Sequence, residues 1–148
     1  MRPIDIIGLI CFIPFMIFIF TYVIFIIAIL FKEANMKDRF EKEGGVRTSR
    51  GGSFLGSTGG DLLNVNGIGV LYLTEEVLHF ELLYPKVQHD IRLEDIAGVD
   101  AQSSYLGKDH GKKIMIVSHM MDGKLVSSGY KVKDLNSWVS DIQKRINR

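Results

Sequence analysis

The sequence predicts a mainly β domain with one closing helix, preceded by a single apolar helix at the N-terminus. Three observations lead to this fold class. An uncharged apolar run fills most of the first 31 residues, short alternating apolar runs follow from Gly67, and the spacing changes to three and four residues after Asp134. We expect a split barrel of roughly six to seven antiparallel strands, capped at one end by the C-terminal α-helix. A chain of 148 residues suits one such domain.

The N-terminal run is long enough to cross a membrane. Of the 26 residues from Ile6 to Phe31, all are apolar except Gly8, Pro14 and Thr21. As a helix they extend about 39 Å, compared with a hydrocarbon core of about 30 Å. A cleaved signal peptide is the alternative, but its apolar region is shorter, and no small-residue cleavage pattern follows Phe31. We therefore predict one transmembrane helix within residues 1–31.

Basic residues near the apolar run predict its orientation. The N-terminal side carries Arg2 alone, whereas the other side carries a series of bases: Lys32, Lys37, Arg39, Lys42, Arg47 and Arg50. Bases near the ends of a span favour the cytoplasmic side. The sequence therefore predicts a single-pass protein with its N-terminus outside and its C-terminal domain in the cytoplasm.

Residues 32–52 read as a juxtamembrane linker. A charged helical continuation from Lys32 to Glu43 precedes Gly44 and Gly45, which end it, and a glycine-rich stretch follows. The run GGSFLGST at Gly51–Thr58 has the glycine and threonine spacing of a phosphate-binding loop. Ser57, however, occupies the position of the required lysine, so we interpret this run as a spacer or hairpin loop.

The first β hairpin is predicted from Gly67 onward. The runs 68–74 and 77–83 are separated by Glu75-Glu76. In the second run Leu78, Phe80 and Leu82 share one face, so His79 and Glu81 are expected on the opposite, outer face. Alternation continues through 87–93 and extends to Val99.

Later elements are predicted in the same way. Residues 105–113 read as a loop, and the runs 114–121 and 125–132 flank Asp122-Gly123, a strong hairpin turn. Asp134 is the expected N-cap of the final helix. Its apolar stripe consists of Leu135, Trp138, Val139, Ile142 and Ile146.

Two runs and the final helix resemble a known family. GIGVLYLTEEVLHF at Gly67–Phe80 resembles the signature of GRAM domains, and IRLEDIAGV at Ile91–Val99 is similar to their next strand pair. The helix bearing Trp138 resembles the closing helix of the pleckstrin-homology-like (PH-like) superfold. The resemblance covers residues 53–148 and matches small membrane-anchored PH-like proteins of the bacterial type.

The resemblance implies a binding module for phosphoinositides, other membrane lipids or proteins. The family's lipid-binding bases lie in the loop between the first two strands. Here that loop, roughly Gly56–Gly67, contains Asp61 and no base.

Basic residues gather elsewhere, in the predicted 105–113 loop and on the following hairpin. The candidate ligand- or partner-binding residues are Lys108, Lys112, Lys113, Lys124, Lys131 and Lys133. They could hold an anionic headgroup near a membrane. The alternative is that they serve solubility and block pairing at strand edges.

The four histidines, His79, His89, His110 and His119, lack metal-ligand spacing, and we predict no metal site. His79 and His89 are expected to face each other across adjacent strands of the outer face.

No nucleophile with a base and an orienting group is evident, so we predict no enzyme and no cofactor. Eighteen basic and seventeen acidic residues give a net charge of +1, and the single cysteine excludes an internal disulfide. A net charge this small creates no strong positive potential that would attract nucleic acid. The sequence predicts a membrane-tethered, non-catalytic binding or adaptor module that presents its domain to a protein partner or a lipid headgroup. The alternative is an accessory subunit that contacts a larger membrane complex through its transmembrane helix.

Overall fold

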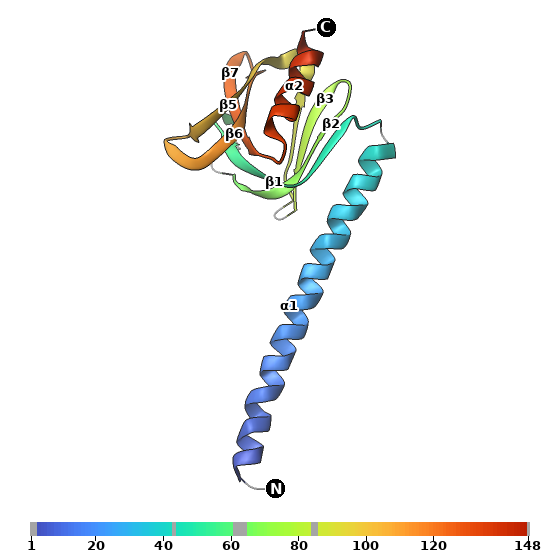
Figure 1. Cartoon of the computed structure of the whole chain (residues 1–148), viewed down its shortest axis with the longest axis vertical. Coiled ribbons are helices and arrows are strands. Elements are labelled where there is room, and N and C mark those ends of the chain that lie inside the picture. Colours follow the sequence, from blue (N-terminus) through green and yellow to red (C-terminus); the bar gives the residue numbers. More distant parts are fainter. Residues whose placement is uncertain (1–2, 43, 61–64, 84–85, 148) are drawn as a thin grey trace.

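A computed structural model describes residues 3–42, 44–60, 65–83 and 86–147. One long helix leads into a β domain that a short helix closes (Figure 1). The elements are α1 (Pro3–Lys42), β1 (Arg47–Ser57), β2 (Gly67–Leu73), β3 (Val77–Leu82), β4 (Gln88–Arg92), a 3₁₀ turn (Leu93–Asp95), β5 (Ile96–Tyr105), β6 (Lys108–Met121), β7 (Lys124–Lys131) and α2 (Leu135–Ile146).

The seven strands form one antiparallel sheet in the order β4-β3-β2-β1-β7-β6-β5. The sheet curls but does not close, because β4 and β5 are its two edges and do not pair with each other. The predicted class is confirmed: a mainly β fold of antiparallel strands with a C-terminal helix, preceded by one apolar helix.

The concave side of the sheet holds the main core. Alternate residues of β3 point inward, as predicted, with Leu78, Phe80 and Leu82 buried. Helix α2 covers one end of this core with Trp138 and Ile142, because its apolar stripe repeats at helical spacing.

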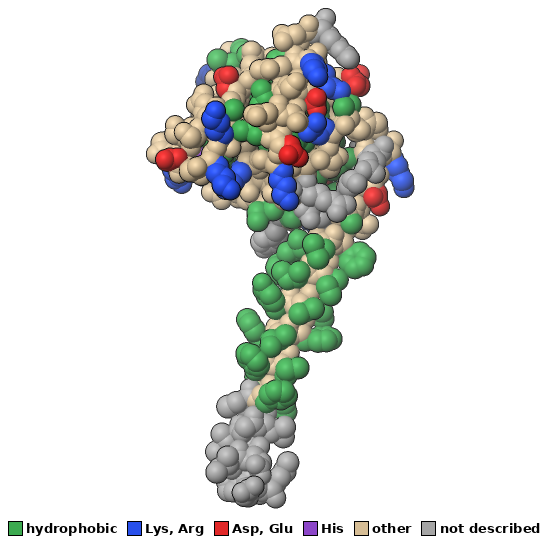
Figure 2. Space-filling model, in the orientation of Figure 1, with side chains coloured by type: hydrophobic (Ala, Val, Ile, Leu, Met, Phe, Trp, Pro, Cys, Tyr) green, Lys and Arg blue, Asp and Glu red, His purple; other side chains and the backbone are tan. Residues whose placement is uncertain are grey.

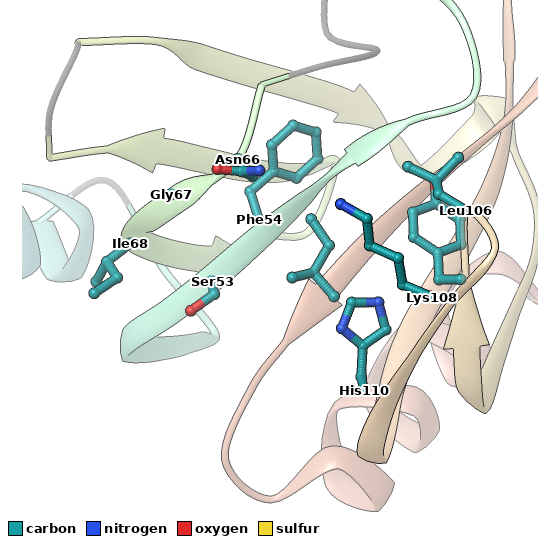
Figure 3. A pocket seen from close by; sticks show the side chains of 10 residues that line it. Ser53, Phe54, Asn66, Gly67, Ile68, Leu106, Lys108 and His110 are labelled. Carbon is teal, nitrogen blue, oxygen red and sulfur yellow. The ribbon is translucent and has the colours of Figure 1, made fainter.

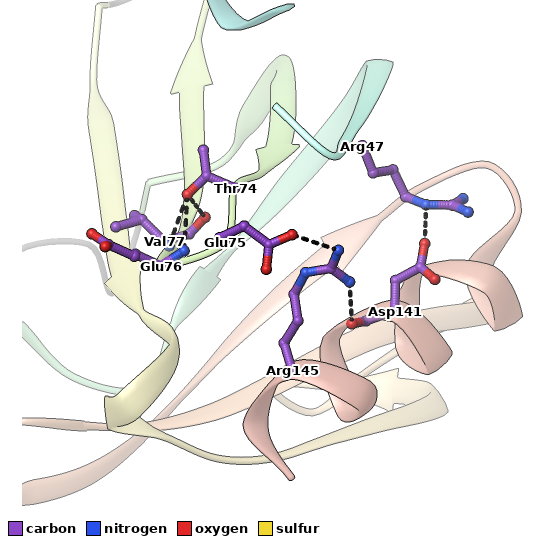
Figure 4. A network of polar contacts seen from close by, with 7 residues as sticks. All are labelled: Arg47, Thr74, Glu75, Glu76, Val77, Asp141 and Arg145. Atoms are coloured by element: carbon purple, nitrogen blue, oxygen red, sulfur yellow. Dashed lines mark hydrogen bonds and ion pairs between the residues drawn. The ribbon is translucent and has the colours of Figure 1, made fainter. Parts of the chain in front are cut away.

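Ion pairs attach α2 to the sheet (Figure 4). The Arg47 guanidinium at the start of β1 lies 2.5 Å from the Asp141 carboxylate and also faces the Trp138 ring. Arg145 pairs with Glu75 in the β2–β3 turn at 3.3 Å. The position of α2 is therefore fixed by charged contacts as well as by core packing.

Strand β1 corrects the predicted linker at 32–52. The strand begins at Arg47 and extends through the glycine-rich run. Gly51 and Gly56 have φ of +64° and +100°, and the register with β2 shifts between Ser49 and Gly52. The glycines therefore mark bends within β1, which pairs with both β2 and β7. Because these bends need glycine, the run resembles a flexible spacer in the sequence.

Two turns have the same geometry, although only one was predicted. Asp122-Gly123 joins β6 and β7 with φ of 51° and 73°, as expected for a two-residue hairpin turn. Leu106-Gly107 joins β5 and β6 with φ of 50° and 73°. The prediction of a loop at 105–113 is therefore wrong. This hairpin extends beyond the core, so its residues carry no apolar alternation.

Asp134 is the N-cap residue of α2, as predicted, but its side chain does not cap the helix. Asp134 precedes α2 but has φ of 53° and ψ of 44°, and its carboxylate makes no capping hydrogen bond. A side-chain cap needs an extended backbone at this position. The carbonyl of Asp134 instead accepts from the amides of Ser137 and Trp138.

Helix α1 contains the predicted apolar segment. From Phe12 to Phe40 its mean hydropathy reaches 2.8, which makes it long and apolar enough to cross a membrane. Apolar side chains surround its described part (Figure 2). The helix continues beyond Phe31 without a break and ends where the amide of Gly45 bonds the carbonyl of Phe40 at 2.9 Å.

Candidate functional site

The six candidate lysines are all exposed, but they do not form one cluster. Lys108, Lys112 and Lys113 lie on β6 rather than in a loop. Ladder pairing of Met115 with Tyr130 brings this end of β6 beside the end of β7 that carries Lys131, with Lys133 just beyond it. Lys124 is at the opposite end of β7, roughly 23 Å away along the strand. The structure therefore separates Lys124 from the other five.

A pocket of about 270 Å³ lies beside Lys108, between β1, the start of β2 and the β5–β6 hairpin (Figure 3). Ile68 and Leu106 form an exposed apolar rim. The Nε2 atom of His110 is buried in its wall without a hydrogen-bond partner among the described residues. The other residues that line the pocket are Ser53, Phe54, Leu55, Asn66, Gly67 and Tyr105. A cation and an unpaired imidazole nitrogen suit an anionic or hydrogen-bonding group.

The last turns of α1 dock onto the outer face of β2 and β3. Met36 and Phe40 are buried against Val70, Tyr72 and the partly buried Leu83. This interface was not predicted from the sequence, because the helix around Met36 and Phe40 carries many charged residues, as an exposed helix does. Its signal was the pair of apolar residues four positions apart, which places both on one face of the helix.

Polar contacts complete this interface. Arg39 of α1 pairs with Glu81 of β3 at 3.0 Å, and the Lys32 ammonium donates to the carbonyl oxygen of Leu83 at 2.6 Å. His79 and Glu81 do lie on the outer face of β3, but they are only 7% and 2% exposed, because α1 covers that face.

The predicted pairing of His79 with His89 is wrong. The register places His79 opposite Asp90 and His89 opposite Phe80, so the two imidazoles point to opposite sides of the sheet. The Nδ1 atom of His79 forms a hydrogen bond with the Asp90 carboxylate. Burial lowers the pKa of His79, although the Asp90 carboxylate opposes that shift.

His89 and His119 contact the same hydroxyl group on the inner side of the curled sheet. Their Nε2 atoms lie 3.2 and 3.1 Å from the Oγ of Ser128, which links β4, β6 and β7. Burial, followed by the neighbouring imidazole of His119, lowers the pKa of His89 to about 4. Because Ser128 is fully buried, its hydroxyl acts as an internal bridge. Within the described part of the chain, no three His, Cys, Asp or Glu side chains are grouped to hold a metal ion.

Parts of two sequence observations lie outside the described residues: Arg2 of the N-terminal flank and Asp61 of the Gly56–Gly67 loop.

No protein-family model matches the chain, and no curated protein matches it. The C-terminal domain of an unknown protein from Leishmania infantum is similar in structure, with a TM-score of 0.52 and 13% identity over 78% of this chain and 98% of that chain. A chain of the 8S snRNP assembly intermediate has a TM-score of 0.49 and 13% identity over 70% of this chain and 80% of that chain. The likeness to the Leishmania domain shows a shared fold alone.

Proposed function

We propose that this protein is a single-pass membrane protein whose helix α1 holds a non-catalytic, PH-like binding domain against the cytoplasmic face of the membrane. One observation carries the proposal: α1 continues from its apolar segment directly into the buried contacts of Met36 and Phe40 with the sheet. A domain attached in this way stays at the bilayer surface in a defined orientation.

The strand order supports the PH-like assignment. Two groups of consecutive antiparallel strands, β1–β4 and β5–β7, are joined where β1 pairs with β7, and a C-terminal helix covers the core. The GRAM-like run at 67–80 forms the β2–β3 hairpin of the first group. Each part of the resemblance therefore corresponds to a structural element.

The charge distribution supports a cytoplasmic domain. Basic residues follow the apolar segment in the sequence. Figure 2 shows Lys and Arg side chains over the visible face of the domain, with some Asp and Glu among them. A tethered domain meets partners at the membrane at high effective concentration, so weak affinity is sufficient. We infer that the pocket beside Lys108 and His110 receives an anionic group, presented by a lipid headgroup or a protein.

Two experiments test this proposal with the full chain. Alkaline extraction and protease protection of membranes should show an integral protein with an accessible domain on the cytoplasmic side. A photo-crosslinking residue at Leu106, on the pocket rim, should capture lipid or a specific protein more strongly than one at the exposed Leu125. Full release at alkaline pH, or equal labelling at both positions, would contradict the proposal.

A further inference from the structure

A second cavity lies where α1 meets the β domain. It has a volume of about 630 Å³ and lies between one side of α1 and the end of β3. Ala28 and Phe31, the last part of the apolar segment, form one wall. This wall continues the surface that α1 presents to hydrocarbon under the function proposed above. The cavity is therefore open to apolar chains at one end.

A second part of the wall, formed by later residues of α1 and by the β domain, is polar and carries excess positive charge. Lys32, Arg39 and Lys86 line it together with the single carboxylate of Glu81, so three cations and one anion give a formal charge of +2. Glu81 is already engaged, at 3.0 Å from Arg39 and 3.9 Å from Lys86, and it accepts a bond from Gln88 at 3.4 Å. The carboxylate is thus satisfied within the protein, and the excess cations remain available to an anion.

The donors are placed for this role. The Lys32 ammonium uses one of its three hydrogens on the carbonyl of Leu83. The Lys86 side chain is 64% exposed, and its ammonium reaches Glu81 only at 3.9 Å. Among the described residues, both ammonium groups therefore keep donor hydrogens that a phosphate oxygen can accept.

We propose that this cavity binds one anionic phospholipid from the surrounding leaflet, with its phosphate between Lys32 and Lys86 and an acyl chain along Ala28 and Phe31. The inference rests on the proposed membrane insertion of α1. The apolar wall favours a lipid over a soluble phosphate, because only a lipid satisfies both walls at once. The charge of +2 favours an anionic headgroup over a zwitterionic one.

Lipid retention by the purified full chain tests the proposal. The protein in detergent is equilibrated with equal amounts of phosphatidylglycerol and phosphatidylcholine that have the same acyl chains, and intact complexes are weighed by native mass spectrometry. We expect a one-to-one complex that prefers phosphatidylglycerol. Lys86→Gln should reduce this retention about fivefold, because one cation near an anionic surface contributes roughly this factor.

Two control variants separate a specific site from general charge. Lys86→Arg keeps the cation and should keep the preference, and Lys124→Gln removes the same charge at the β6–β7 turn and should have no effect. Equal retention of both lipids by the wild type, or equal loss in Lys124→Gln, would overturn the proposal. Alkaline extraction keeps the two proposals apart: an integral protein without lipid preference defeats only this one, whereas an extractable protein defeats membrane insertion itself.

Discussion

Phe40 of α1 stacks on Tyr72 of β2, with ring centroids 3.3 Å apart and planes inclined by 22°. The stack joins α1 to the outer face of the sheet, next to the buried Met36 of the same helix. His79 packs beside Tyr72, with ring centroids 4.3 Å apart, and so extends the stack toward Asp90. The orientation of α1 relative to the domain therefore depends on a small aromatic cluster.

Phe40→Ala should reduce the free energy of unfolding of the domain by about 3 kcal/mol, because it removes a fully buried aromatic ring and leaves a cavity. Thermal or chemical unfolding of the full chain in detergent measures this loss. Phe31→Ala is the matched control, since Phe31 belongs to the same helix but is 67% exposed. Equal losses in the two variants would contradict a role for the interface.

Arg39→Gln should destabilise the same interface by about 2 kcal/mol, since it leaves the buried Glu81 carboxylate without its closest cation. The loss is smaller than for a fully buried pair because Arg39 is half exposed and Lys86 remains near. Arg92→Gln removes the exposed pair with Glu94 and should leave the unfolding midpoint unchanged. A midpoint unchanged in Arg39→Gln as well would show that the ion pair contributes nothing.

The fold should lose stability as the pH falls from about 6.5 toward 4. Burial lowers the pKa of His89 to about 4 and also lowers that of His119, so the unfolded chain takes up protons before the folded chain does. For His89 this effect contributes about 3 kcal/mol to the free energy of unfolding above pH 6.5. The contribution is lost as the pH falls to about 4. Denaturant unfolding across this range should show a shallower pH slope in His89→Asn than in the wild type. An identical slope would show that the lowered pKa does not govern acid stability.

Gly129→Ala should destabilise the domain by about 1–3 kcal/mol, because the new methyl group would lie 2.6 Å from atoms of the Tyr105 ring. That ring is anchored by its hydroxyl, which donates its single hydrogen to the carbonyl of Ser127 and lies 3.3 Å from the carbonyl oxygen of Gly56. Gly98→Ala is the control, since a methyl group there meets no atom within 4 Å. Circular dichroism melting of the two variants makes the comparison, and similar melting temperatures would contradict it.

The core of the fold was predictable from the sequence, because apolar alternation in 77–82 and helical spacing from Leu135 both report burial directly. Strand β1 could not be predicted because its bends require glycine. The β5–β6 hairpin could not be predicted because it extends past the core into solvent. Periodicity carries no information on such segments. The turn at Asp122-Gly123 was recognisable because its residue types alone favour positive φ.

The candidate sites were less predictable. The sequence identifies the lysines, but only the strand register shows that Lys112 and Lys113 lie near Lys131. The burial of His79 and Glu81 depends on a helix more than 35 residues away in the chain, and no local sequence pattern connects that helix to them. Burial of an outer sheet face by a distant element is a tertiary event, and alternation within one strand cannot distinguish a covered face from a solvated one.

Helix α1 continues without a break from the apolar segment to Phe40. The number of residues between the two therefore sets how the β domain is rotated and raised relative to the apolar segment. Each residue inserted between Phe31 and Lys32 would turn the domain by about 100° around the helix axis and raise it by about 1.5 Å. Under the proposed membrane insertion, with α1 tilted, this rotation decides which side of the domain is nearest the lipid. A single insertion there would therefore change the direction in which the Lys108 pocket faces relative to the apolar segment. Every contact inside the domain would stay intact.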